Sequence, residues 1–349
     1  MSRTEDLHHF LAEAGLDPAR VTPLAGDASN RRYYRLCAEQ VVVMDSPRDR
    51  GEDVTPFVAV TNWLRDGGFS APAIHAADLD RGFLLLEDLG DDLFRRVCAR
   101  TPALEGDLYG NAVDLLVELH RLAPPATLET GVEPLPLTPY DHRVLMRESD
   151  LLTQWYLPGT TDHETPGQLA AEFSALMEDL TRPVAEARAV VVLRDYHAEN
   201  LIWLPARQNI ARTGLLDYQD ALAGHQAYDL VSLLEDARRD TSQELRDAMI
   251  GRYLKKTGAE PGAFRSAYAR LGAQRNIKII GIFARLCLRD GKAQYPDLIP
   301  RVWEHLMRDL EHPDLHLLKD WVARHVPVPE PSVISDLRRR AGALTAERA

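Results

Sequence analysis

Val190-Val191-Val192-Leu193-Arg194-Asp195-Tyr196-His197-Ala198-Glu199-Asn200 is the stretch of this sequence that decides its fold. The apolar run at its start is typical of a buried strand that delivers Asp195 into a loop, and Asn200 follows five residues later. A second apolar run, Leu215-Leu216, ends at Asp217, and Arg207-Gln208-Asn209 predicts a hairpin turn between the two runs. The pattern therefore predicts that two carboxylates and one amide converge at one site.

These three side chains are the types that phosphoryl transfer requires. One carboxylate can orient an attacking hydroxyl group and accept its proton, whereas carboxylate and amide oxygens are ligands that suit Mg²⁺. Aspartate and asparagine are also common in turns, and for a lone Asp-x-x-x-x-Asn motif a turn is a sufficient explanation. The additional Asp217, with a glycine turn and a hinge-like segment upstream in matching order, favours a nucleotide-phosphate site.

The composition excludes several classes of protein. A net charge of -12 argues against nucleic acid as a partner, and the one basic cluster, Arg338–Arg340, is expected to be a solvated helix face. The chain has no apolar run near the roughly 18 residues that cross a bilayer, and its start does not resemble a signal peptide. Its cysteines, Cys37, Cys98 and Cys287, are widely spaced, which is typical of reduced thiols. We therefore expect a cytoplasmic protein with no membrane partner.

The periodicity of apolar residues changes near Gly90, and this change indicates two lobes. The first part predicts strands over residues 21–24, 32–37, 40–44 and 83–86, and helices over residues 5–15 and 53–67. The second part predicts helices over residues 103–122, 141–156, 166–186, 228–238, 243–256, 261–288 and 299–311, with a β island at residues 189–193, 201–204 and 213–216. We therefore predict an α+β fold with a small β-rich N-terminal lobe (1–89), a hinge near residue 88, and a larger, mainly helical C-terminal lobe (90–349).

Further segments match a known family in the same order along the chain. They are Gly26–Arg35, Val43–Pro47, Leu84–Gly90, Leu216–Ala221 and Gln274–Lys292. With these segments the chain resembles the aminoglycoside and choline phosphotransferases, a family related to the protein kinases. Within that family it most resembles the bacterial kinases that phosphorylate the anomeric hydroxyl of N-acetylmuramate and N-acetylglucosamine in peptidoglycan recycling. The resemblance implies a bilobal protein-kinase-like fold, ATP and Mg²⁺ as cofactors, and a small-molecule sugar as acceptor.

The resemblance also implies roles for individual residues. It makes Asp195 the catalytic base, and it makes Asn200 and Asp217 the Mg²⁺ ligands. ATP would be bound by the glycine turn, a nearby arginine and the hinge backbone, namely Gly26, Asp27, Ala28, Ser29, Asn30, Arg32, Glu87 and Leu89. For the two hinge residues, a plain strand end followed by a turn is an equally good interpretation.

Two positions depart from the pattern of the wider kinase group. Met44 stands where a strand lysine is expected, and no lysine precedes position 255. Other groups must then offset the phosphate charge, with Arg31, Arg32 and Arg35 as local candidates that are equally well explained as exposed strand arginines. Leu193 replaces a histidine, a change that concerns the support of the loop rather than its chemistry.

Four further residues are candidates for substrate binding or for support of the catalytic loop. His197 would face either the acceptor sugar or solvent. Arg275 would either pair with a carboxylate, such as the lactyl group of muramate, or form a structural salt bridge, and Arg285 is a second substrate candidate on the same predicted helix. Asp229 resembles the family aspartate that braces the catalytic loop, but as an N-terminal helix residue it could simply cap the helix.

The functional prediction is an ATP-dependent kinase that transfers the γ-phosphoryl group to a sugar hydroxyl. Close alternatives are a kinase for another sugar, for choline or for an aminoglycoside, since one fold serves many acceptors. A more distant alternative is a catalytically weak nucleotide-binding regulator, which the missing lysine and Leu193 suggest. We expect a monomer whose partners are a sugar and a nucleotide.

Overall fold

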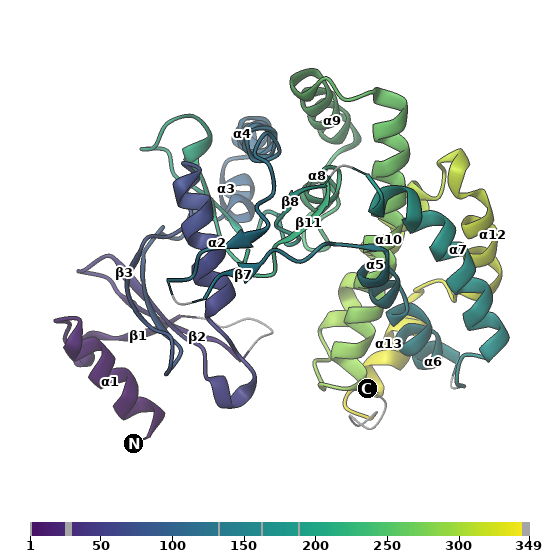
Figure 1. Ribbon diagram of the computed structural model, residues 1–349. Helices are drawn as coiled ribbons and strands as arrows, with labels where there is room; N and C mark the ends of the chain where they lie inside the picture. The colour runs from purple at the N-terminus through teal and green to yellow at the C-terminus, as the bar shows by residue number, and fades with distance from the viewer. Residues whose placement is uncertain (1, 25–29, 132, 162, 188, 344–349) are drawn as a thin grey trace. The chain divides into compact units, whose positions relative to one another are not determined.

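The computed structural model describes residues 2–24, 30–131, 133–161, 163–187 and 189–343 (Figure 1). The chain divides into two compact units. The first comprises Met1–Leu119, Pro124–Leu137 and Leu193–Ala221, and the second comprises His120–Ala123, Thr138–Val192 and Leu222–Ala349. The segment from Asp195 to Asp217 thus belongs to the first unit, whereas the lobe boundary between residues 89 and 90 stays a prediction.

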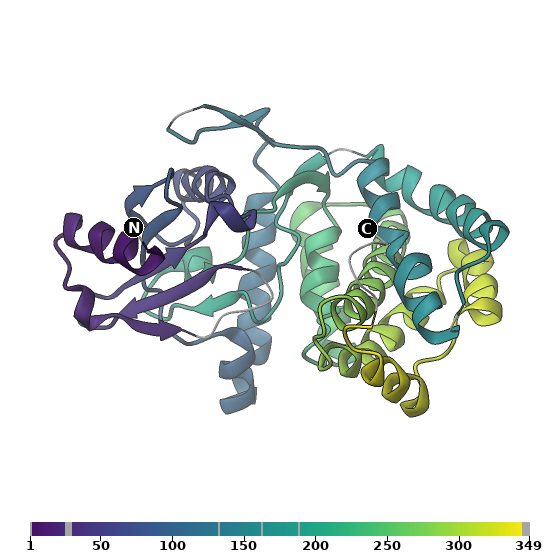
Figure 2. The ribbon, with the colours of Figure 1, turned by 90° about the horizontal axis from the view of Figure 1, so that it is seen from below.

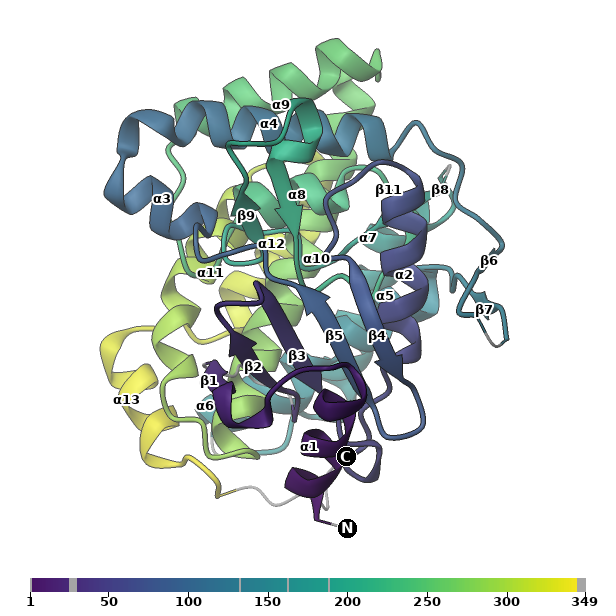
Figure 3. The same ribbon diagram turned by 90° about the vertical axis from the view of Figure 1, so that its left-hand side faces the viewer.

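The first unit is built on a five-stranded antiparallel sheet (Figure 3). Its strands lie in the order β1 (Thr22–Leu24), β2 (Arg32–Leu36), β3 (Val41–Asp45), β5 (Phe83–Glu87) and β4 (Ile74–Asp78). All but β4 confirm predicted strands. The sequence does not predict β4, because Ile74-His75-Ala76-Ala77-Asp78 contains one large apolar residue and therefore shows no clear alternation.

Helix α1 (Arg3–Glu13) covers one side of this sheet, which we call the α1 face. The apolar residues of this layer, from the helix and the strands, are Leu7, Phe10, Leu11, Leu36, Val41, Val43, Phe83 and Leu85. Arg3 ties the start of the helix to the sheet, because its guanidinium pairs with the buried Asp45 carboxylate and lies 4.0 Å from the centre of the Phe83 ring.

The remaining elements of the first unit hold the segment that follows Leu193. They are α2 (Thr55–Asp66), α3 (Phe94–Arg100), α4 (Glu105–Leu119), the short pair β6 (Thr127–Leu128) and β7 (Leu135–Pro136), and the hairpin of β9 (Leu201–Trp203) and β10 (Thr213–Leu215). Asn111 on α4 accepts a hydrogen bond from the Thr213 hydroxyl at 2.7 Å and donates one to Asn209 O at 3.0 Å. Helix α4 therefore fixes both the turn and the second strand of the hairpin.

The second unit is helical, with one two-stranded sheet (Figure 2). Its helices are α5 (His142–Ser149), the π-helical turn Leu152–Tyr156, α6 (Leu157–Thr161), α7 (Gly167–Ala185), α8 (Tyr228–Leu234), α9 (Gln243–Thr257), α10 (Pro261–Leu288), α11 (Ile299–Asp309), α12 (His316–His325) and α13 (Pro331–Arg339). Helix α10 contacts α5, α7, α8, α11 and α13, so it is the centre of this core. None of the helices in the described ranges has the length and apolarity that would let it cross a membrane.

Gly281 allows the π-helical segment to approach α10 closely. A Cβ atom at this position would lie 2.4 Å from the carbonyl carbon of Leu151, which no side chain tolerates. The same approach divides the predicted helix over residues 141–156 into α5 and a separate π-helical turn.

The structure corrects the predicted β island at residues 189–193, 201–204 and 213–216. Strand β8 (Ala189–Val192) pairs with β11 (Leu222–His225) in the second unit, whereas β9 pairs with β10 in the first. The sequence does not predict β11, because Leu222-Ala223-Gly224-His225 lacks the β-branched and aromatic residues that mark strands. The α+β class itself is confirmed.

Gly82 offers a sharp test of the sheet, because it combines a left-handed backbone with a close contact. Its φ is +74°, and a Cβ atom there would lie 2.1 Å from the carbonyl oxygen of Ser46. We expect Gly82→Ala to lower the free energy of unfolding by about 3 kcal/mol or more. Gly68 is a matched control with φ +81° and open space around it, so Gly68→Ala should cost only about 1–2 kcal/mol. Chemical denaturation measures both, and equal losses would contradict the contact between Gly82 and Ser46.

Candidate active site

The loop from Leu193 to Asn200 is held by short backbone hydrogen bonds. The N–H of Asp195 donates to Leu193 O at 2.9 Å, that of His197 to Asp195 O at 3.1 Å, and that of Asn200 to His197 O at 2.8 Å. Arg194 has φ +70°, a left-handed conformation in which the chain turns sharply after strand β8. The backbone is therefore fixed on both sides of Asp195.

Helix α4 supports the same loop through Tyr196. The buried Tyr196 hydroxyl donates to Ala112 O at 2.8 Å. Leu193 is also buried, so the residue that replaces a histidine serves as a packing group in this protein. The hydrogen bond of Tyr196 to α4 therefore supports the loop in which Leu193 replaces a histidine.

Asn200 joins the two carboxylate-bearing segments. Its amide nitrogen donates to Asp195 O at 2.9 Å and lies 3.5 Å from Asp217 Oδ2. The backbone carbonyl of Asn200 accepts from the N–H of Leu216 at 2.9 Å. The three predicted residues therefore come together, and Asn200 Oδ1 is left without a hydrogen-bond donor among the residues that the structure describes.

Asp217 is positioned by the residues that follow it. Its φ is +57°, a left-handed conformation that aspartate adopts more readily than most residues. Gln219 Nε2 donates to its Oδ1 at 2.8 Å. The next residue, Tyr218, is buried, shares a 2.7 Å hydrogen bond with the Thr61 hydroxyl of α2 and stacks on Phe57 at 5.2 Å. Helix α2 thus anchors the end of strand β10.

The surroundings of Asp217 disfavour its negative charge. The side chain keeps contact with solvent, but the protein atoms packed around it remove enough water to raise the pKa of its carboxyl group, and the charge of Asp195 raises it further. The Gln219 hydrogen bond and the side chains of Arg31 and His197 oppose this rise in pKa. Asp195 and Asp217 therefore act on each other electrostatically, and a cation beside them would be stabilising.

Comparison with known proteins identifies the family. Residues 20–267 match the sequence profile described as "Phosphotransferase enzyme family". The chain belongs to this family. It is 40% identical to an N-acetylmuramate/N-acetylglucosamine kinase of Caulobacter vibrioides, over 91% of this chain and 95% of that protein. It is 37% identical to a protein of the same name from Pseudomonas aeruginosa, over 85% of this chain and 86% of that protein.

A solved structure shows the same fold. The protein is similar to an aminoglycoside phosphotransferase crystallised with ADP, with a TM-score of 0.58, 16% sequence identity, and coverage of 86% of this chain and 96% of that one. At this identity the likeness concerns the fold alone. It confirms the predicted phosphotransferase-type fold.

The donor set of this phosphotransferase suits Mg²⁺ better than a transition metal. The described part of the chain contains no cluster of three or more His, Cys, Asp or Glu side chains that could hold a metal ion. Asn200 and Asp217 instead offer hard oxygen donors, and Mg²⁺ commonly takes one or two protein ligands together with water and phosphate oxygens. The residues present therefore fit a magnesium ion that arrives with a nucleotide.

The predicted nucleotide-binding residues have different environments. Gly26, Asp27, Ala28 and Ser29 lie outside the described residues. The N–H of Asn30 donates to Glu52 Oε1 at 3.0 Å, and the Arg32 side chain is exposed. These assignments stay predictions.

The two hinge residues differ in the backbone groups that they offer. The N–H of Glu87 donates to Ala73 O at 2.8 Å, and its carboxylate pairs with Arg207. The N–H of Leu89 makes no hydrogen bond within the described ranges. Leu89 therefore offers a nucleotide base a donor that Glu87 does not, while the role of both residues stays a prediction.

The predicted substrate and brace residues lie in both units. His197 is buried and does not face bulk solvent. In the second unit, Arg275 is buried and donates to Ser232 Oγ at 2.9 Å, a structural hydrogen bond, and its two predicted roles stay predictions. Burial lowers the pKa of Arg285, with the charge of a neighbouring arginine adding to the effect. Asp229 is fully buried in α8, whose N-cap is the preceding Ala227.

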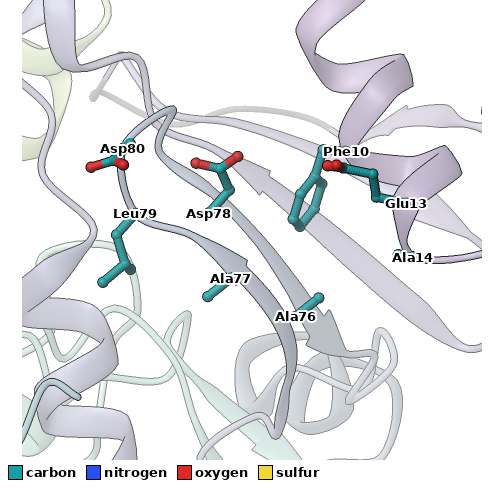
Figure 4. A pocket seen from close by; sticks show the side chains of 8 residues that line it. All are labelled: Phe10, Glu13, Ala14, Ala76, Ala77, Asp78, Leu79 and Asp80. Atoms are coloured by element: carbon teal, nitrogen blue, oxygen red, sulfur yellow. The ribbon is translucent and has the colours of Figure 1, made fainter. Parts of the chain in front are cut away.

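A cavity of about 570 Å³ lies elsewhere in the first unit, on the α1 face of the sheet (Figure 4). In the figure Phe10 and Glu13 line one side, and Asp78, Leu79 and Asp80 line the other. Two of the carboxylates that line the cavity are already neutralised, because Arg81 pairs with Glu13 at 3.2 Å and with Asp78 at 2.5 Å. None of Asp195, Asn200 and Asp217 lines this cavity, so it is separate from the candidate active site.

Sequence reasoning missed the residues that hold the site in place. Thr61, Glu52 and Ala112 are distant in sequence from the residues that they bind, and no local pattern marks them. Gln219 lies within a segment that matches the family, so its position was a usable signal, but its contact with Asp217 required the fold.

The electrostatics of Asp217 lead to a prediction about stability and pH. Since folding raises the pKa of this carboxyl group above 3.8, the ionised form destabilises the folded protein at neutral pH. Asp217→Asn keeps the acceptor for Gln219 and removes the charge, so we expect a higher Tm than that of the wild type at pH 7. The gain should shrink as the pH falls and should vanish below 3.8, where wild-type Asp217 becomes protonated in both states.

Thermal denaturation at several pH values measures this effect. Asp220→Asn is the control, because Asp220 is an exposed aspartate of the same segment. A Tm at pH 7 that is equal to or below the wild-type value in Asp217→Asn would contradict the proposed repulsion.

Proposed function

We propose that this protein is an ATP-dependent sugar kinase that phosphorylates the anomeric hydroxyl of N-acetylmuramate and N-acetylglucosamine. The observation that carries the proposal is the convergence of Asp195, Asn200 and Asp217 in a member of the phosphotransferase family. The names of the curated relatives, which match most of this chain, support the choice of acceptor. By the same reasoning, the protein would serve cell-wall recycling in the cytoplasm.

Asp195 would act on the acceptor. Its backbone is fixed by the loop and by Asn200, which leaves the carboxylate as the group that can bind and orient a hydroxyl. As the phosphoryl group is transferred, this carboxylate accepts the proton that the hydroxyl loses. Such positioning accounts for much of the rate in phosphoryl transfer, because little covalent assistance is required.

Asn200 and Asp217 would hold the cation. Asn200 Oδ1 and the Asp217 carboxylate would supply the oxygen ligands for it. When bound, Mg²⁺ offsets the negative charge of the nucleotide phosphates. The raised pKa of Asp217 agrees with this role, since a divalent cation relieves the unfavourable charge that the surroundings impose.

The nucleotide would lie in the first unit, with its base at the hinge. The N–H of Leu89 is the available donor there, and the segment from Gly26 to Asn30 would contact the phosphates. The ADP-bound aminoglycoside phosphotransferase of the same fold supports nucleotide use by this chain. The choice of acceptor sugar rests on the curated relatives, and a monomeric state stays a prediction.

Removal of the base is the direct test of the function. We expect Asp195→Asn to lower kcat for ADP release with N-acetylmuramate and N-acetylglucosamine by about 10²- to 10⁴-fold. Glu199→Gln is the control in the same loop, because the Glu199 carboxylate pairs with Arg95 at 2.8 Å, and it should keep wild-type activity. A coupled assay of ADP release measures both variants.

The acceptor panel also includes glucose, choline and kanamycin. Turnover of choline or kanamycin in preference to the amino sugars would contradict the proposed acceptor but keep the kinase. Nucleotide binding without turnover on any acceptor would favour the regulator. Full activity of Asp195→Asn would overturn the mechanism.

A further inference from the structure

Two carboxyl groups meet in the buried core of the second unit. Glu235 is the C-cap residue of α8, and Asp309 is the last residue of α11. Their exposed fractions are 1% and 5%, so water solvates neither group well. The proposed phosphoryl transfer uses neither residue, and a buried carboxyl group is unfavourable unless a partner neutralises its charge. The pair therefore requires an explanation of its own.

One amide nitrogen of α10 joins the two carboxyl groups. Asn276 is fully buried, and its Nδ2 atom lies 2.7 Å from Glu235 Oε2 and 2.9 Å from Asp309 Oδ2. The two carboxyl oxygens are therefore no further apart than the sum of these two distances. At such a separation, in a core that holds little water, two negative charges would repel each other strongly.

Gly272 gives the Asp309 carboxyl group its place against α10. A Cβ atom at this position would lie 2.5 Å from Asp309 Oδ2 and 2.7 Å from Asp309 Oδ1. The carboxyl group therefore rests directly on the helix backbone, in the space that a side chain at position 272 would fill. The close packing of α11 on α10 thus holds Asp309 beside Glu235.

The arginines around the pair are bound elsewhere. On α9, Arg246 donates to Thr241 Oγ1 at 3.2 Å. On α11, Arg308 Nη1 lies 3.1 Å from His305 Nδ1. Throughout the described ranges, no ion pair joins either carboxyl group to a lysine, an arginine or a histidine. The pair therefore has no basic partner that neutralises it.

The other titratable and charged groups of this core do not supply that partner either. Burial lowers the pKa of His305, so its ring is neutral at neutral pH. Burial raises the pKa of the Tyr268 hydroxyl of α10 far above its usual range. Asp236, the residue after Glu235, is itself acidic, and Arg275 donates to the backbone oxygen of Glu235 at 3.4 Å rather than to its carboxyl group.

A proton shared by the two groups removes the repulsion. A carboxyl group that keeps its proton can donate its O–H to the other carboxylate, while Asn276 Nδ2 still donates to both. Burial and the charge of Glu235 raise the pKa of Asp309 well above its usual range, and the Asn276 hydrogen bond and the charge of Arg308 oppose this rise. A metal ion would fit less well, because the Asn276 group that faces both carboxyl groups is a donor and not an oxygen ligand.

We propose that Glu235 and Asp309 share one proton, and that this proton forms a pH-sensitive contact between α8, α10 and α11. Loss of the proton leaves two adjacent negative charges in the core, so a rising pH weakens the packing of the second unit. The folded protein holds a proton that the unfolded chain releases above pH 3.8. Its stabilising contribution is therefore complete below pH 3.8 and is lost as the pH rises through the raised pKa of Asp309.

Infrared spectroscopy detects the shared proton directly. The C=O stretching band of a protonated carboxyl group is separate from the carboxylate bands, and exposed carboxyl groups are ionised at pH 7. We expect the wild type to show this band at pH 7 and the difference spectrum against Asp309→Asn to reveal its loss. Glu235→Gln should lose the band too, because a single carboxylate then accepts from two amide groups. Glu304→Gln is the control on α11, since Glu304 is exposed, and it should keep the band.

Urea denaturation across a pH series measures the consequence for stability. Asp309→Asn should fold, because its amide N–H replaces the acid O–H as the donor to Glu235. Relative to this variant, the unfolding equilibrium constant of the wild type should rise by up to about tenfold per pH unit between about pH 5 and the raised pKa, which is the effect of one proton.

Three results would overturn the proposal. They are infrared spectra of the wild type and Asp309→Asn that do not differ in this band, a parallel pH dependence of the two proteins, and an Asp309→Asn chain that does not fold at pH 7. None of these measurements uses nucleotide or sugar, so they decide the proposal independently of the kinase assay.

Discussion

Two aspartates whose segments are joined by one amide are the constraint on which the rest of this structure depends, because Asn200 contacts the backbone carbonyl of Asp195 and the carboxylate of Asp217. Asp195 and Asp217 repel each other where protein atoms have displaced much of the water, and the repulsion adds to the rise in the pKa of Asp217. Such an arrangement persists only when the backbone is held from outside. Here Tyr196 is bound to α4 and Tyr218 to α2, so the folded core stabilises a site that is unfavourable in isolation and therefore receptive to a cation.

The two faces of the sheet in the first unit have different roles: residues on one face stabilise the fold, and residues on the other face lie toward the candidate active site. The α1 face carries the apolar layer and the ion pair of Arg3 with Asp45, whereas the opposite face carries Tyr33, on which the charge of Asp217 acts. The cavity on the α1 face is consistent with this division, since Arg81 already pairs with two of the carboxylates that line it. The chemistry thus depends on one face of the sheet and on the hairpin that follows Asp195.

The sequence was sufficient to predict residues whose signal is local. Asp195 and Asp217 each follow an apolar run, so their proximity could be inferred, and the family resemblance was confirmed. It could not reveal Glu52 as the partner of Arg31, because a pairing across 21 positions leaves no periodic trace. The sequence also could not show on which face of the sheet Arg32 and Arg35 of β2 lie, since that depends on how the strand is packed. Strands β4 and β11 were not predicted, because their alanines and glycine have a low β-strand propensity.

The most direct test of the central claim is to locate the bound metal. Crystals grown with ADP and Mn²⁺, which substitutes for Mg²⁺, can be measured at the manganese absorption edge. The account predicts an anomalous peak in contact with Asn200 Oδ1 and the Asp217 carboxylate, bridged to the phosphates of ADP. A peak that contacts neither residue, or ADP bound away from Asp195, would contradict it.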